Sequence, residues 1–428
     1  MPSATRRKPR HVKAVNLALQ GGGAHGAFTW GVLDKLFEDD RLWIEAISGT
    51  SAGAMNAVVA AQGMFDGHAP GAREALHTFW RAVSDAGRSS PFQRSPIDMM
   101  MGNWSLETSP GYIWMDLLNR MASPYDLNPF GLNPLRDLVE KHVDFAKVRD
   151  AEGMGIFLSA TNVETGHARV FHREEITIDV VMASACLPFM FQAVEIDGAP
   201  YWDGGYMGNP PLFPFFDGSP ADDIIIVQIN PVYRPGTPRR ARDILNRVNE
   251  ITFNSALMHE LRSIDLICRL IGAGKLSRDD YRAMNVHVIE ARKQMRQLGA
   301  SSKLNAEWRF LRHLFEIGRA SASKWLEAHF DDIGERSTID FRDMFAGTST
   351  LPEMKPDTLP PSAASEEAIA SAAAAAGSPP AAAAAAAAAS APATAAKRPR
   401  RKPPGPQTAA ASPRPDPPAA AAAPAKTR

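Results

Sequence analysis

The sequence predicts an α/β domain with a central, mainly parallel sheet flanked by helices. Two observations near the N-terminus predict it: an apolar strand leads through a glycine-rich turn into an amphipathic helix, and a second strand leads through a serine-containing turn into another helix. A third is the apolar run from Ile224 to Ile229, which suits a later buried strand. Alternating strands and helices favour parallel strands joined by crossover helices.

The first strand and helix follow from hydrophobic periodicity. "KAVNLAL", from Lys13 to Leu19, is a short apolar run typical of a buried strand. The stretch after the glycine turn carries apolar residues at helical spacing, which predicts one core-facing stripe: Phe28, Val32, Leu33, Leu36 and Phe37.

The glycine turn Gly21-Gly22-Gly23-Ala24-His25-Gly26 has two interpretations. It satisfies the GxGxxG pattern of dinucleotide-binding sites, which also place an acidic residue about 20 residues later. This chain has the serine turn there instead, which disfavours nucleotide binding. We favour an oxyanion hole, in which successive amides of Gly22, Gly23 and Ala24 face a developing negative oxygen. Such donors commonly lower a barrier by ~3 kcal/mol each.

The serine turn lies in "WIEAISGTSAGAMNAVV", which begins at Trp43. We predict a strand, a sharp turn at Gly49-Thr50-Ser51-Ala52-Gly53, and a helix through about Ala61. A GxSxG motif on a strand-to-helix turn exposes the serine hydroxyl at the end of a sheet. Ser51 is therefore the candidate nucleophile.

The candidate general base is an aspartate. None of the eleven histidines follows a late core strand in a distinctive turn, where a triad histidine is expected. Asp203 instead ends the second arm of a predicted hairpin in "VEIDGAPYWDGG". Gly204 and Gly205 follow it and allow backbone or ligand to approach closely.

Together, the glycine turn, the Ser51 elbow and Asp203-Gly204-Gly205 occur in an order that resembles the patatin-like phospholipase family. Supporting stretches include "FLSATNVETG" and "ASACLPFMFQAVEIDGAPYWDGG", and the resemblance covers about residues 13–345. It implies a three-layer patatin-like fold, a Ser51–Asp203 dyad without histidine, an oxyanion hole in residues 21–26, and no metal or cofactor. One departure is His25, which stands where the family usually has arginine. His25 would supply a positive charge only when protonated, and we predict that it affects the rate little.

Charge and composition divide the chain of 428 residues. Its net charge is zero, yet residues 1–13 carry +5 and residues 351–428 carry +4, which leaves −9 for the body. We predict a basic arm at 1–12, a hydrolase domain at 13–345 (core 13–231, helical extension 232–345) and a disordered Ala/Pro-rich tail at 346–428 with a basic patch at 397–402. The basic ends suit peripheral contact with an anionic membrane, whereas nucleic-acid binding is not favoured.

Between the elbow and the next core elements, residues 64–135 contain many apolar and aromatic side chains, among them Phe79, Trp80, Trp104, Trp114 and Phe130. We favour an extra helical layer over the sheet. The alternative is an acyl-chain channel or an interfacial lid, since methionine and aromatic side chains adapt to flexible chains.

The predicted function is hydrolysis of lipid ester bonds in a phospholipid or related glycerolipid. Two alternatives stay open: the same chemistry on acyl thioesters or a storage polyester, and a non-catalytic, membrane-associated adaptor. Cys186 and Cys268 are too few for a disulfide framework, and no leader peptide or membrane-spanning apolar run is recognised. We therefore expect a cytoplasmic protein, with membrane contact limited to its periphery.

Overall fold

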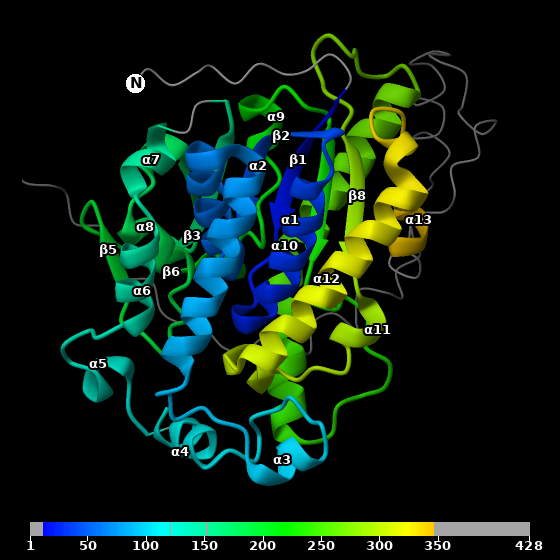
Figure 1. The fold of residues 1–428 in the computed structure, drawn as a ribbon. Coiled ribbons are helices and arrows are strands. Elements are labelled where there is room, and N and C mark those ends of the chain that lie inside the picture. The colour runs from blue at the N-terminus through cyan, green and yellow to red at the C-terminus, as the bar shows by residue number, and fades with distance from the viewer. Residues whose placement is uncertain (1–11, 120, 151–152, 346–428) are drawn as a thin grey trace, which may run out of the picture. The chain divides into compact units, whose positions relative to one another are not determined.

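The computed structural model describes residues 12–119, 121–150 and 153–345 (Figure 1). The basic arm, except residue 12, and the Ala/Pro-rich tail with its basic patch at 397–402 lie outside the described residues. The strands of the described part are β1 (Lys13–Leu19), β2 (Leu42–Gly49), β3 (Gly155–Asn162), β4 (Ala168–His172), β5 (Val194–Ile196), β6 (Ala199–Asp203), β7 (Asp223–Gln228) and β8 (Asn285–Glu290).

Helices of very different length connect and cover these strands. They are α1 (Gly26–Glu38), α2 (Ala52–Gly87), α3 (Pro96–Met100), α4 (Pro110–Leu118), α5 (Pro124–Leu127), α6 (Pro134–His142), α7 (Phe145–Asp150), α8 (Ile178–Ser184), α9 (Pro214–Gly218), α10 (Ala241–Gly272), α11 (Arg292–Met295), α12 (Trp308–His329) and α13 (Phe341–Met344). Helix α2 runs well past the predicted end near Ala61, with a kink at Gly67 and His68.

The strands form one mixed sheet that is parallel at its centre, as predicted. β2 pairs with β1, β1 with β7, β7 with β8, and β2 with β3, all in parallel. Side chains of successive residues point to opposite faces of a sheet. Leu17 and Leu19 thus join the core formed with α1, α2 and α12, whereas Ala18 joins the core formed with α9 and α10. The result is the predicted three-layer arrangement (Figure 1).

The register around β3 brings two strand ends together. Phe157 and Leu158 pair with both β2 and β4, and Ala160 and Thr161 pair with both β4 and β6. Because a strand has only two edges, β2 and β6 must share one edge of β3. β2 ends at Gly49 opposite Leu158, and β6 ends at Asp203 opposite Ala160. The two strand ends therefore meet with Ser159 between them.

The residues after 231 complete the same core. β8 extends the sheet beyond β7, and α12 packs along α1. The helices α1 and α12 approach so closely at Gly31 and Gly318 that a Cβ on either glycine would collide with backbone of the other helix. Beyond the end of α12, Lys13 Nζ donates to the carbonyl of Ile333 at 2.7 Å, which links the first strand to the segment that follows the last long helix.

The segment from 64 to 135 divides into two unlike parts. Phe79 and Trp80 of α2 are buried and form the predicted helical layer. The side chains of Met100, Trp114 and Phe130, in the segment that contains α3, α4 and α5, are largely exposed, so the helical-layer prediction was wrong for this part. No helix among the described residues is both long and apolar enough to cross a bilayer.

Candidate active site

Ser51 lies on a strained turn between β2 and α2. Its backbone has φ 55° and ψ −120°, a conformation that L residues rarely adopt. Strain of this kind persists where the surrounding structure fixes it, and it is frequent at active sites. The amide of Ser51 donates to Ser184 Oγ at 3.0 Å, and Thr50 Oγ1 donates to the carbonyl of Gly208 at 2.7 Å. The predicted strand-turn-helix elbow is therefore present, and hydrogen bonds to two other segments of the chain hold it in place.

Asp203 is held just as firmly. Its amide donates to the carbonyl of Cys186 at 2.7 Å, and its Oδ1 accepts the amide of Gly205 at 2.7 Å. The side chain is buried, and Oδ2 has no hydrogen-bond partner in the described part of the chain. An unpaired buried carboxylate oxygen is costly, so its presence needs a reason.

Burial raises the pKa of Asp203 to about 7. The amide of Gly205, the nearby hydroxyl of Ser51 and the charge of Lys303 oppose this by lowering the same pKa. The hydroxyl of Ser51 thus lies near enough to influence the carboxyl, although the two groups do not form a well-aligned hydrogen bond. A carboxyl with a pKa near neutrality is suited to accept and return a proton at physiological pH.

The glycine loop touches the candidate nucleophile. A Cβ added to Gly21 would lie 2.7 Å from the Cβ of Ser51. Gly21 donates its amide to Asn209 Oδ1 at 2.7 Å, while the amides of His25 and Gly26 bond to carbonyls within the loop. The amides of Gly21, His25 and Gly26 are therefore already engaged within the fold. The amides of Gly22, Gly23 and Ala24 have no acceptor among the described residues.

His25 is a buried, neutral side chain. Burial, followed by the charges of Lys303 and Arg234, lowers its pKa well below the usual value. Ser302 Oγ donates to the carbonyl of Gly299, so it accepts the proton of His25 Nε2 across 2.8 Å. His25 thus braces the glycine loop against the 300–304 turn without supplying a charge.

A nearby positive charge comes from Lys303 instead. Its carbonyl oxygen would lie 2.5 Å from a Cβ on Gly23, so the 300–304 turn rests on the glycine loop. Its ammonium group donates to Asn230 Oδ1 at 2.8 Å, and Asn230 Nδ2 donates to the carbonyl of Gly21 at 2.8 Å. Lys303 therefore supports the loop and also lowers the pKa of Asp203.

Sequence reasoning missed several residues that hold this site. Asn209 joins the segment after Asp203 to the glycine loop, and Ser159 Oγ lies 2.6 Å from Thr50 Oγ1. Ser184 ends α8, and Lys303 lies in the 300–304 turn. Ser159 and Ser184 lie in stretches that support the family resemblance, whereas Asn209 and Lys303 lie outside them. Each of the four acts through a contact that only the folded chain creates.

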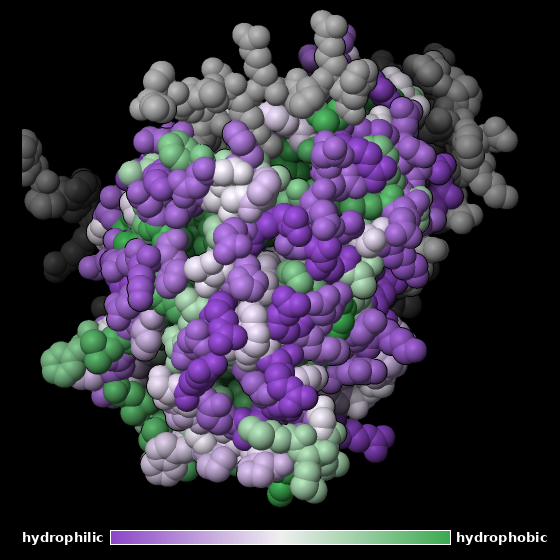
Figure 2. Space-filling model, viewed as in Figure 1, coloured by the Kyte–Doolittle hydropathy of each residue, from purple (hydrophilic) through white to green (hydrophobic). Residues whose placement is uncertain are grey.

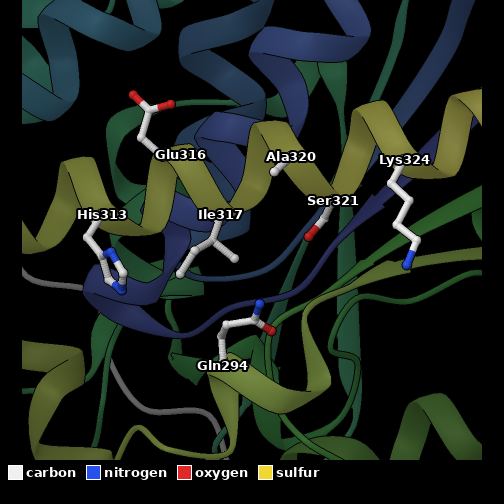
Figure 3. Close-up of a pocket in the computed structure, with 7 residues that line it drawn as sticks. All are labelled: Gln294, His313, Glu316, Ile317, Ala320, Ser321 and Lys324. Carbon is white, nitrogen blue, oxygen red and sulfur yellow. The ribbon is translucent and has the colours of Figure 1, made fainter.

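A separate hollow of about 370 Å³ lies between α11 and α12. In Figure 3 the side chains of His313 and Ile317 point toward Gln294, and Glu316 points away. No residue of the predicted site lines this hollow. Within the described ranges, no cluster of three His, Cys, Asp or Glu side chains is arranged to hold a metal ion.

Comparison with known proteins gives both a sequence match and structural matches. Residues 17–216 match the family model described as patatin-like phospholipase. Similar solved structures include VipD from Legionella pneumophila, with 15% identity, a TM-score of 0.34, and 75% of this chain and 67% of VipD covered. Another is ExoU, a type III effector protein, with 15% identity, a TM-score of 0.31, and 75% of this chain but only 53% of ExoU covered. No curated protein matches the chain.

Proposed function

We propose that this chain, whose residues 17–216 belong to the patatin-like phospholipase family, hydrolyses lipid esters with Ser51 as nucleophile and Asp203 as general base. Family membership implies lipid ester hydrolysis. The observation that supports the dyad is the strained Ser51 turn beside a buried Asp203 carboxyl whose Oδ2 lacks a partner in the described chain.

In the first half-reaction, Ser51 Oγ attacks the acyl carbonyl carbon while its proton passes to Oδ2 of Asp203. The carbonyl oxygen becomes an oxyanion, which the amides of Gly22, Gly23 and Ala24 stabilise as pre-positioned donors. Asp203 then gives the proton to the leaving oxygen as the ester bond breaks. The products are an alcohol and an acyl group bound to Ser51.

In the second half-reaction, a water molecule replaces the alcohol. Asp203 takes one proton of this water while its oxygen attacks the acyl carbon. Collapse of the second oxyanion breaks the bond to Ser51 Oγ, which regains its proton from Asp203. A free carboxylic acid leaves, and both residues return to their starting states.

The proposed substrate is the carboxylic ester of a phospholipid or related glycerolipid. Turnover of a phospholipid, an acyl thioester and a polyester, measured side by side, distinguishes this substrate from the other two that the chemistry allows. We expect the phospholipid to give the highest kcat/KM. A higher value for the thioester or polyester would keep the mechanism and change the substrate.

A fluorophosphonate probe tests the dyad directly, because it reacts with activated serine hydroxyls. We expect labelling of the wild type, none of Ser51→Ala, and labelling of Asp203→Asn slowed at least ~100-fold, since general-base assistance typically contributes 10²–10⁴-fold. A folded wild-type chain that stays unlabelled with and without phospholipid vesicles would contradict the proposal.

A further inference from the structure

Helix α4 has no buried side. None of its residues is buried, although its sequence, PGYIWMDLL, contains a single charged residue. The side chain of Trp114 is 62% exposed. A helix that is apolar on nearly all sides normally lies inside a protein or a membrane. The exposed side chains of Ile113, Trp114 and Leu117 therefore leave an apolar surface on α4 open to solvent.

The exposed apolar surface extends beyond α4. We call residues 96–132 the apolar strap; its most exposed large side chains are those of Met100, Met101, Met121, Phe130 and Leu132. Figure 2 shows apolar residues gathered along the lower edge of the view, over α3, α4 and α5. Contiguous exposed patches of this kind mark surfaces that bind a protein or a membrane.

One side of the strap is attached beside the glycine loop. Leu106 donates its amide to Ser301 Oγ at 3.2 Å, and Asn305 Nδ2 donates to the carbonyl of Trp104 at 3.1 Å. Between these two anchors, Ser302 and Lys303 contact the glycine loop. The part of the strap around Trp104 and Leu106 therefore lies next to the proposed oxyanion donors.

The other side is attached beside Asp203. Gln192 Nε2 donates to the carbonyl of Asn128 at 2.7 Å, and Ala193 donates its amide to Tyr125 Oη at 3.2 Å. The segment that makes these contacts begins at Cys186, whose carbonyl holds the amide of Asp203. Phe189 of this segment is 70% exposed. The strap thus runs from one side of the candidate site to the other.

Charge identifies the kind of surface that fits the strap. Residues 96–132 contain four acidic residues and one basic residue, so attraction to anionic groups cannot hold the strap on a partner. The exposed side chains of Trp114 and Tyr125 each have an apolar body and a polar tip, which suits the boundary between lipid headgroups and acyl chains. These features fit an electrically neutral lipid surface.

We infer that the apolar strap docks this protein onto a zwitterionic phospholipid bilayer and so brings the candidate site to its substrate. This inference rests on the proposed lipid hydrolase function. It differs from the sequence-based expectation of contact through basic ends, because binding is carried by apolar side chains and does not need anionic lipid.

Flotation with phosphatidylcholine vesicles tests the inference in the full chain carrying Ser51→Ala, which leaves the lipid intact. We compare Met100→Gln/Trp114→Gln/Phe130→Gln with a matched control, Leu245→Gln/Val248→Gln/Ile251→Gln, whose positions on α10 are also exposed. Because binding of an apolar surface scales with its buried area, we expect about tenfold weaker partitioning for the strap variant and less than about twofold for the control. Thermal unfolding midpoints are measured to check that both variants remain folded.

Two results would overturn the inference. One is a folded strap variant that binds phosphatidylcholine as tightly as the control. The other is binding that requires phosphatidylglycerol and disappears in 0.5 M salt, which would assign membrane contact to the basic ends. Because Ser51→Ala does no chemistry, vesicle binding can fail while fluorophosphonate labelling of the wild type succeeds, and the reverse also holds.

Discussion

The candidate site and the apolar strap lie side by side and are built in opposite ways. The side chains of Ser51 and Asp203 are 9% and 1% exposed, and backbone hydrogen bonds fix both residues. In the strap, Met100 is 90% exposed and Phe130 86%. Reacting groups need fixed positions, since small displacements cost large factors in rate. A lipid surface instead needs accessible, adaptable side chains.

The sharpest test of the fixed site is Asp203→Asn. We expect turnover to fall about 1,000-fold or more, because the general base is lost. The amide can still accept the hydrogen bond from Gly205, and it removes a buried charge. We therefore expect the thermal unfolding midpoint at pH 8 to rise by about 2 °C or more.

The rise in the unfolding midpoint of Asp203→Asn should depend on pH, and the direction of this dependence can be derived. Burial raises the folded-state pKa of Asp203 above the unfolded value, so the folded chain holds this proton more tightly. The wild type consequently loses stability as the pH rises from about 4 through about 7. The advantage of Asp203→Asn should shrink as the pH falls toward 4. A variant less stable than the wild type at pH 8 would contradict this account.

Activity should follow the same ionisation. Hydrolysis needs the Asp203 carboxylate, so we expect kcat/KM to rise with pH and to reach half its maximum near pH 7. Lys303→Met should move this midpoint to higher pH, because the lysine charge lowers the pKa of Asp203. Lys324→Met is the control, since Lys324 is not among the groups that act on Asp203. An unchanged midpoint for Lys303→Met would show that Lys303 does not influence the pKa of Asp203.

The strain at Ser51 predicts a smaller effect on stability. Ser51→Gly and Ser51→Ala both remove the nucleophile, but only glycine adopts φ 55° and ψ −120° readily. We expect Ser51→Gly to be more stable than Ser51→Ala by about 1 kcal/mol in urea unfolding. Equal stability, or a more stable alanine variant, would mean that the turn is not strained.

The smallest effect on catalysis is expected for His25→Ala. The imidazole is neutral and donates to Ser302 rather than to substrate. Its removal should destabilise the fold by about 1–3 kcal/mol while changing kcat at pH 8 by less than about fivefold. A folded His25→Ala chain as inactive as Ser51→Ala would show that the loop depends on this side chain.

The local elements of this fold were predictable because local sequence determines them. β1 has the predicted bounds, and the helix after the glycine turn, the Ser51 elbow and the hairpin before Asp203 form where the pattern placed them. The meeting of Ser51 with Asp203 was expected only from the family resemblance. It depends on β2 and β6 sharing one edge of β3. The sequence of β3 does not show which strands pair with it or in which register.

The supporting residues and the strap were beyond sequence reasoning for related reasons. Asn209, Ser159 and Lys303 act through contacts between segments far apart in the chain. In residues 64–135 the sequence shows which side chains are apolar, but it does not show which of them find a partner. Phe79 is buried and Phe130 is not, although both are phenylalanines in the same stretch.

The close contact of Gly31 with α12 has a consequence during synthesis. The partner residues Phe315 and Gly318 follow Gly31 by nearly three hundred positions. At 5–20 residues per second, a ribosome needs roughly 15 to 60 s to make that interval. Throughout this time α1, including the core residues Phe28 and Trp30, has no α12 to cover it. The nascent chain therefore exposes an aromatic surface that a chaperone can bind until the last long helix emerges.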